Sequence, residues 1–171
     1  NLFRYVDNVK EDKKPLALIG YDIEEGVDIL KKTNSLEKID VKIHPTTSES
    51  QFDKYMKDDW GYVYGDLYEA LKGADVVFTP PYAGTSLEAV ACVPVIIIAN
   101  EGNLINPLVN YGKGEIWDIA FNEQDVKKHY DNLLKYKNNN LDKVEKIACW
   151  YKENFFVEPT EENIVRAFEF N

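Results

Sequence analysis

The chain has 171 residues, of which 44% are hydrophobic and 29% are charged, and its formal net charge is −10 at pH 7. This size and balance indicate one globular domain with a core of its own, not a disordered chain. The acidic excess argues against nucleic acid or an anionic membrane surface as the main partner, because both require a basic protein face.

Other features of the composition concern location. No apolar run approaches the length of a membrane span, and no signal peptide is visible. Cys92 and Cys149 lie in apolar helical contexts, which is typical of buried thiols and not of a disulfide or a metal site. We therefore expect a reducing, cytoplasmic location. Because the chain begins with Asn1 and not with Met, we also expect an excerpt of a longer protein, with any targeting signal cut away.

Short apolar runs alternate with amphipathic stretches along the chain. After a charged segment over 1–14, interpreted as a linker or domain-crossing segment, the pattern predicts strands at 16–20, 41–44, 61–64, 76–79, 93–99 and 116–121. Helices are expected between these strands, from Asp22, over 51–57, from Asp66 and from Thr85. A long loop over 100–114 precedes the last strand. Three helical stretches then follow, with inward stripes at Val126, Tyr130, Leu133 and Leu134, at Leu141, Val144, Ala148 and Tyr151, and at Ile164, Val165 and Phe168.

This alternation predicts the fold class. Central strands that are almost wholly apolar imply a parallel sheet with both faces covered. We expect a single α/β domain over 15–171, with a Rossmann-like parallel sheet, helices on both faces and extra C-terminal helices. Ligands of such sheets bind beyond the carboxyl ends of the strands. Those ends carry Gly20, His44, Gly65, Thr79 and the loop 100–103.

The most informative local pattern is a turn that leads into a helix at Gly84, Thr85 and Ser86. Backbone N–H groups and the helix dipole point at whatever lies before a helix, so this turn predicts an anion site suited to a diphosphate. Two other interpretations stay open. Thr85 and Glu88 match a capping box, in which each side chain bonds the backbone of the other residue. Gly84 could also serve only to supply a positive φ in the turn.

The segment Thr79–Ala99, TPPYAGTSLEAVACVPVIIIA, resembles the donor-binding half of the GT-B glycosyltransferases. In those enzymes a turn of Gly, Ser and Thr and the following helix hold the nucleotide diphosphate, and a Glu on that helix takes the ribose. The resemblance implies that Gly84, Thr85 and Ser86 contact phosphate and that Glu88 contacts the ribose hydroxyls. It covers roughly 15–120 of the chain.

Two departures from the family pattern qualify this resemblance. Many retaining members carry a second Glu where this chain has Pro80, which counts against the retaining class with that pair. Many members also carry a Gly before the Val-Pro-Val segment, whereas here Cys92 runs directly into Val93. Neither departure removes the turn that is expected to bind phosphate.

Another candidate is the pair His44–Pro45 at the end of the second predicted strand. It resembles the His-Pro pair that contacts the donor phosphate in bacterial sialyltransferases and in CDP-glycerol polymer transferases. An imidazole N–H can donate to a phosphate oxygen. The alternative is a histidine that ends a strand without any ligand. Gly20 is expected to border the donor base or the interdomain cleft, unless it is only a turn residue, and His129 is expected to lie solvated on a charged helix face.

Taken together, the resemblance implies the C-terminal, nucleotide-sugar-binding half of a GT-B glycosyltransferase of surface polysaccharide assembly. It would move a sugar or a polyol-phosphate from a nucleotide donor to a glycan acceptor, and would be inactive without an N-terminal domain. No catalytic residue is nominated, and neither a metal nor another cofactor is expected. At most peripheral membrane association, through the full-length protein, is expected. A nucleotide-sugar 2-epimerase and a non-catalytic α/β binding module remain the alternatives.

Overall fold

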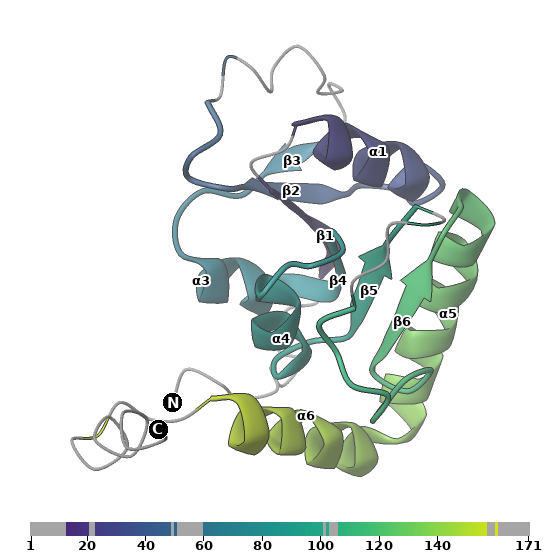
Figure 1. Cartoon of the computed structure of the whole chain (residues 1–171). Helices are drawn as coiled ribbons and strands as arrows, with labels where there is room; N and C mark the ends of the chain where they lie inside the picture. The colour runs from purple at the N-terminus through teal and green to yellow at the C-terminus, as the bar shows by residue number, and fades with distance from the viewer. Residues whose placement is uncertain are drawn as a thin grey trace.

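The computed structural model describes residues 13–20, 23–48, 50, 60–100, 102, 106–156 and 160. Strands and helices alternate along most of the chain (Figure 1). The elements are β1 (Lys14–Ile19), α1 (Ile23–Thr33), β2 (Asp40–Ile43), β3 (Gly61–Tyr62), α3 (Leu67–Lys72), β4 (Ala74–Thr79), α4 (Thr85–Val90), β5 (Val95–Ile98), β6 (Trp117–Ala120), α5 (Glu123–Asn139) and α6 (Leu141–Phe155).

The strands form one six-stranded sheet in the order β3-β2-β1-β4-β5-β6, and every adjacent pair is parallel. Each of the six predicted strands is present, with ends shifted by a few residues. This order is that of a doubly wound Rossmann-like sheet, in which the chain first builds outward from β1 in one direction and then in the other. The predicted fold class is therefore confirmed.

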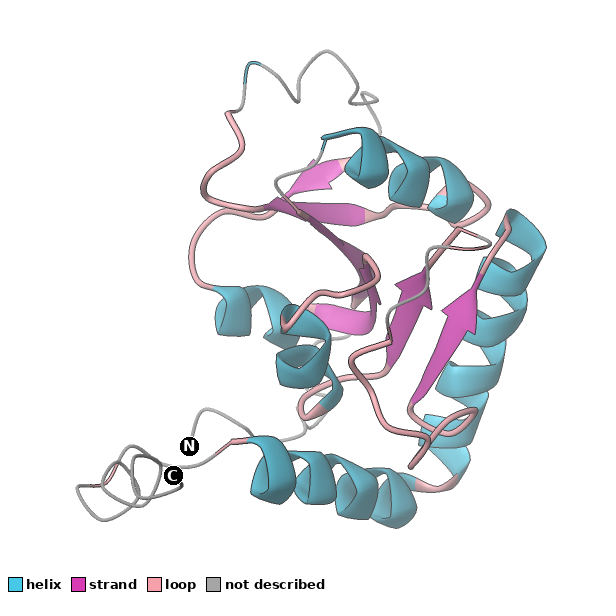
Figure 2. Cartoon of the chain, viewed as in Figure 1, coloured by secondary structure: helices cyan, strands magenta, loops and turns pink. Residues whose placement is uncertain are grey.

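Helices cover both faces of the sheet and divide the core in two (Figure 2). Helices α3, α4 and α6 pack on one face, and α1 and α5 pack on the other. Along β5, Val95 and Ile97 belong to the first core, whereas Ile96 and Ile98 belong to the second. A strand that is buried on both faces has no solvent side, and this explains why β5 is apolar at every position.

Local capping signals account for two helix starts. Asp66 caps α3 as predicted, and its carboxylate accepts a 2.7 Å hydrogen bond from the Tyr68 amide. Asn122 caps α5 and accepts a 2.8 Å bond from the Asp125 amide. The predicted cap at Asp22, the predicted helix over 51–57 and the predicted last helix, which follows Thr160, lie outside the described residues.

The C-terminal helices follow their predicted stripes in large part. Val126 and Leu133 of α5 are buried, as are Val144, Ala148 and Tyr151 of α6. The Tyr151 hydroxyl lies 2.8 Å from the carbonyls of two residues in the long loop before β6, and this contact ties the loop to α6. Among the described residues, no helix is both long enough and apolar enough to cross a membrane.

Three expectations about single side chains were wrong. His129 is not solvated, because its Nδ1 lies 2.9 Å from the Asp118 carboxylate, and both side chains are less than one-fifth exposed. Cys149 is exposed, although Cys92 is buried as expected. Leu141 is also exposed, because it is the first residue of α6 and lies beyond the edge of the core.

Candidate functional site

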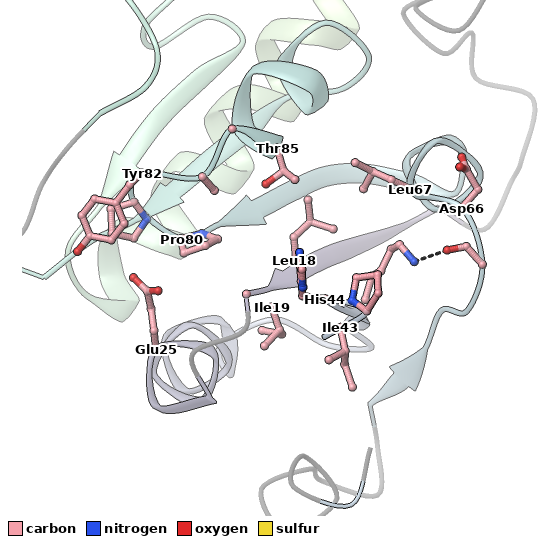
Figure 3. Close-up of a pocket in the computed structure, with 17 residues that line it drawn as sticks. Leu18, Ile19, Glu25, Ile43, His44, Asp66, Leu67, Pro80, Tyr82 and Thr85 are labelled. Atoms are coloured by element: carbon pink, nitrogen blue, oxygen red, sulfur yellow. Dashed lines mark hydrogen bonds between the residues drawn. The ribbon is translucent and has the colours of Figure 1, made fainter. Parts of the chain in front are cut away.

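A cavity of about 710 Å³ opens at the carboxyl edge of the sheet (Figure 3). Its walls come from the segments that follow β1, β2, β3 and β4, together with the first turns of α1, α3 and α4. Strands β1 and β4 are neighbours in the sheet. After β1 the chain continues to β2 on one side, and after β4 it continues to β5 on the other side. Loops diverge at such a switch point and leave a crevice, which is where doubly wound sheets bind their ligands.

The structure brings four of the six predicted site residues together around this cavity. Gly20, His44, Gly84 and Thr85 line it, although they come from three different strand ends. Most of the remaining wall is apolar, contributed by residues such as Leu18. A pocket with apolar walls and a few polar groups is the usual form of a small-molecule site.

His44 is held at the rim by backbone and side-chain bonds. Its amide donates to the Ile19 carbonyl at 2.9 Å, which continues the pairing of β2 with β1 by one residue. The ring Nδ1 accepts from the Thr46 amide at 3.2 Å and lies 2.7 Å from the Thr46 hydroxyl. Since an N–H donates to Nδ1, the proton of the neutral ring belongs on Nε2. The turn therefore fixes both the position and the tautomer of this side chain.

Gly84 does not provide a positive φ, so that interpretation was wrong. Its φ is −56° and its ψ is −29°, a conformation that any residue adopts. A Cβ added to Gly84 would meet no atom within 4 Å. Neither backbone conformation nor packing against the protein therefore requires glycine at this position. What glycine does provide is a bare backbone at the wall of the cavity.

The capping-box interpretation of α4 was also wrong. Gly84 is the N-cap, and no side chain bonds the first turn. Ser86 is fully buried, and its Oγ lies 2.7 Å from the Thr79 Oγ1 at the end of β4. Ser86 faces back toward the sheet, so its hydroxyl does not reach the cavity, in contrast to the expectation. With only six residues, α4 also contributes a smaller dipole than a long helix would.

Glu88 lies on α4 and does not line the cavity. Partial burial raises the pKa of its carboxyl group. Its charge in turn adds to burial in raising the pKa of Tyr68 and in raising that of Cys92 to about 11. The predicted ribose contact would therefore have to form outside the residues that line the cavity.

Sequence reasoning missed four residues that line the cavity: Glu25, Lys42, Asp66 and Tyr82. The Lys42 ammonium donates to the Gly65 carbonyl and brings a positive charge to the end of β2. Tyr82 is 42% exposed and has a φ of 60°. That conformation is unusual for a bulky residue, and such residues are concentrated at functional sites. The one available signal was position, since all four lie within a few residues of a predicted strand end.

The part of the chain that the structure describes contains no evident metal site. There, no group of three or more His, Cys, Asp and Glu side chains comes together in a way that could hold an ion. The polar groups of the cavity are instead a lysine, a histidine, two carboxylates, the hydroxyls of Tyr82 and Thr85, and the backbone around Gly84. This set can bind an anion at one place and hydroxyl or amino groups at another.

Comparison with known proteins gives a likeness in structure alone. No protein-family model matches the chain, and no curated protein matches it in sequence. One similar solved structure is that of the wall teichoic acid polymerase TagF, with 14% identity and a TM-score of 0.49 over 82% of this chain and 39% of that one. A second TagF structure, with CDPG, has 17% identity and a TM-score of 0.48 over 85% of this chain and 37% of that one.

This chain thus spans about two fifths of the length of the solved chains that it matches. The likeness to these chains is one of fold alone.

Proposed function

We propose that this chain is the donor-binding half of a glycosyltransferase, which moves a sugar or a polyol-phosphate from a nucleotide donor to a surface glycan. The single observation that carries the proposal is the cavity at the switch point between β1 and β4, lined by His44, Gly84 and Thr85. These are the residues for which the sequence resemblance implied contacts to the donor phosphates. The further partners in this proposal are the glycan acceptor and an N-terminal domain, in a cytoplasmic protein with at most peripheral membrane association.

The chemistry that this site would support is stabilisation of the leaving group. When a sugar is transferred, its C–O bond breaks and negative charge accumulates on the nucleoside diphosphate that leaves. When a polyol-phosphate is transferred, the P–O bond of the diphosphate bridge breaks and the charge accumulates on the nucleoside monophosphate that leaves. Groups that are already in position stabilise that charge without having to reorganise. Lys42, the His44 ring and the backbone around Gly84 are such groups at the cavity wall. Such a site would need no divalent metal. The acceptor and any general base belong to the N-terminal domain in this proposal, so no catalytic base is assigned.

Glu88 is the proposed ribose contact. Its carboxylate would accept hydrogen bonds from the two ribose hydroxyls while the diphosphate extends into the cavity. Wild-type protein should therefore bind a ribonucleoside diphosphate more tightly than its dideoxy analogue, and Glu88→Gln should reduce that preference. Equal affinities for both nucleotides would remove this role from Glu88.

Isothermal titration of the 171-residue chain with UDP-, GDP-, CDP- and CMP-linked donors tests the function itself. At least one donor should bind in the millimolar range or better, and EDTA should leave its affinity unchanged. The affinity should be modest, because half of a two-domain cleft leaves much of the ligand in water. If no donor binds at millimolar concentration, or if EDTA abolishes binding, the proposal fails.

A further inference from the structure

One short segment supplies much of the cavity wall. Every residue of the turn between β4 and α4, 80–85, lines the cavity. Figure 3 labels Pro80, Tyr82 and Thr85 on this part of the wall. The residues on either side of the turn, Thr79 and Ser86, do not line the cavity. The shape of the wall therefore depends on what holds the 80–85 turn in place.

The backbone of the 80–85 turn is not sufficient to hold its conformation. Pro80 and Pro81 have no backbone N–H, so they cannot donate a hydrogen bond within the turn. Tyr82 has a φ of 60°, a left-handed conformation that residues with a Cβ adopt rarely. In an unrestrained chain a right-handed or extended conformation would be favoured at such a residue by a factor of about ten. Contacts beyond the backbone of the turn must therefore select the observed conformation.

Thr79 and Ser86 supply such a contact. Their hydroxyl oxygens lie 2.7 Å apart, and both residues are fully buried. Thr79 is the last residue of β4, which lies between β1 and β5 in the sheet, and Ser86 lies in the first turn of α4. One hydrogen bond thus joins the two ends of the 80–85 turn and ties them to the centre of the sheet. Because both hydroxyls are buried, water cannot easily replace either partner.

We infer that Thr79 and Ser86 are positioning residues of the nucleotide site, whose hydrogen bond holds the 80–85 turn in the arrangement that contacts the ligand. Neither side chain lines the cavity, so the pair acts through the turn. This inference rests on the proposed function, in which Gly84 and Thr85 of the turn contact the donor phosphates. A turn without this bond would adopt the binding arrangement for only part of the time, and the apparent affinity would fall by that fraction.

The alternative is that the hydrogen bond serves only to stabilise the fold, and a double variant distinguishes the two roles. Ser86→Ala or Thr79→Val alone leaves the other hydroxyl buried without its partner, which destabilises the fold. The two substitutions together leave an apolar pair of similar shape, which costs the fold little. A role in stability alone predicts wild-type affinity in the double variant. A positioning role predicts that the affinity stays low although the stability returns.

The test measures donor affinity by isothermal titration and Tm by circular dichroism, in the 171-residue chain. The probes are UDP-glucose, GDP-mannose, CDP-glycerol and CMP-N-acetylneuraminate. The variants are Ser86→Ala, Thr79→Val, the two combined, and Thr79→Ser, which retains the hydroxyl. The matched control is Thr33→Val, because Thr33 is also fully buried and its hydroxyl bonds the carbonyls of Ile29 and Leu30, outside the cavity wall.

The expected result separates affinity from stability. For the donor that wild-type protein binds best, the double variant should melt within about 2 °C of wild type but bind about tenfold more weakly. Ser86→Ala and Thr79→Val should each bind about as weakly as the double variant and melt about 3–8 °C lower than wild type. Thr79→Ser and Thr33→Val should both keep their affinity within about twofold of wild type.

Two outcomes would overturn the inference in distinguishable ways. If the double variant binds the donor as tightly as wild type, the hydrogen bond serves the fold alone, and the proposed function still stands. If wild-type protein binds none of the donors at millimolar concentration, the proposed function and the positioning role fail together. Should the double variant not fold, Thr79→Val and Thr79→Ser decide instead, and equal affinities in these two would overturn the inference.

Discussion

At the level of single residues, substitutions of Gly84 should affect ligand binding without destabilising the fold. Its backbone is already helical and a Cβ would enter open space, so Gly84→Ala should not destabilise the fold and should raise the free energy of unfolding by at most about 1 kcal/mol. The same methyl group would stand between the turn and a phosphate. Nucleotide affinity should therefore fall by about tenfold, and further for Gly84→Val, as backbone bonds to a charged group are lost.

Calorimetric titration and denaturant unfolding of the same Gly84 variants measure the two quantities. A variant that loses stability but keeps its affinity would show that glycine serves the fold after all. That result would separate the turn from the ligand site.

His44 is the second residue for which the structure sharpens a sequence hypothesis. If its ring donates from Nε2 to a phosphate, His44→Ala should lower the affinity for a nucleoside diphosphate by about 1–2 kcal/mol and leave that for the nucleoside unchanged. His44→Asn should retain the turn, because its side-chain oxygen can still accept from the Thr46 amide, yet lose the same affinity.

The control for His44 is His129→Ala, since His129 pairs with Asp118 and does not line the cavity. Nitrogen shifts of the His44 ring, recorded by NMR with and without nucleotide, give a direct readout. A ring that ignores the ligand would leave His44 as a strand-end residue and remove the His-Pro pair from the functional argument.

At the element scale, α3 depends on one cap that also belongs to the cavity wall. Asp66→Ala removes the bond to the Tyr68 amide and should cost about 1 kcal/mol, a fall in Tm of about 2–4 °C for a domain of this size. Asp66→Asn keeps an equally good cap but removes a negative charge. It should therefore melt like wild type and bind pyrophosphate more tightly.

Thermal melting and pyrophosphate titration of the two Asp66 variants check these expectations. Equal destabilisation by both substitutions would mean that the charge of Asp66, and not its hydrogen bond, holds the start of α3.

At the scale of the whole molecule, Lys137 makes stability depend on pH. Burial in α5, with a smaller contribution from the charge of Lys13, lowers the pKa of Lys137 from its ordinary 10.5 to about 8, and Asp75 partly opposes this. Between these values the folded chain binds fewer protons than the unfolded chain, so the free energy of unfolding rises with pH. From pH 7 to 9.5 this contribution amounts to about 1–2 kcal/mol.

The comparison that isolates this effect uses Lys137→Met. Denaturant unfolding at pH 7, 8 and 9.5 should show wild type gaining stability relative to this variant as pH rises. Lys135→Met, at an exposed position of the same helix, should show no such trend. Parallel pH profiles for wild type and Lys137→Met would mean that Lys137 keeps an ordinary pKa in the folded chain.

Local sequence patterns are sufficient to predict the elements and the fold class. Strands such as β5 are apolar at every position because a parallel sheet between two helix layers leaves no face for water, and this signal is local. The cap at Asp66 and the stripe that buries Val144 and Tyr151 are local in the same way. Because the carboxyl ends of parallel strands share one edge, the sequence also predicts that His44 and the turn at Gly84 lie near each other.

The contacts between side chains of different elements, in contrast, depend on the tertiary structure. The sequence allows the Ser86 side chain to face either a ligand or the sheet. It faces the sheet because its hydroxyl forms a buried hydrogen bond with the Thr79 hydroxyl. Glu25 and Tyr82 are far apart in sequence and became cavity residues only through the pairing of β1 with β4. His129 of α5 contacts the Asp118 carboxylate of β6 because α5 packs on β6. Periodicity assigns a residue to a face of its own element, but contacts between elements depend on strand order and helix rotation, which no local pattern encodes.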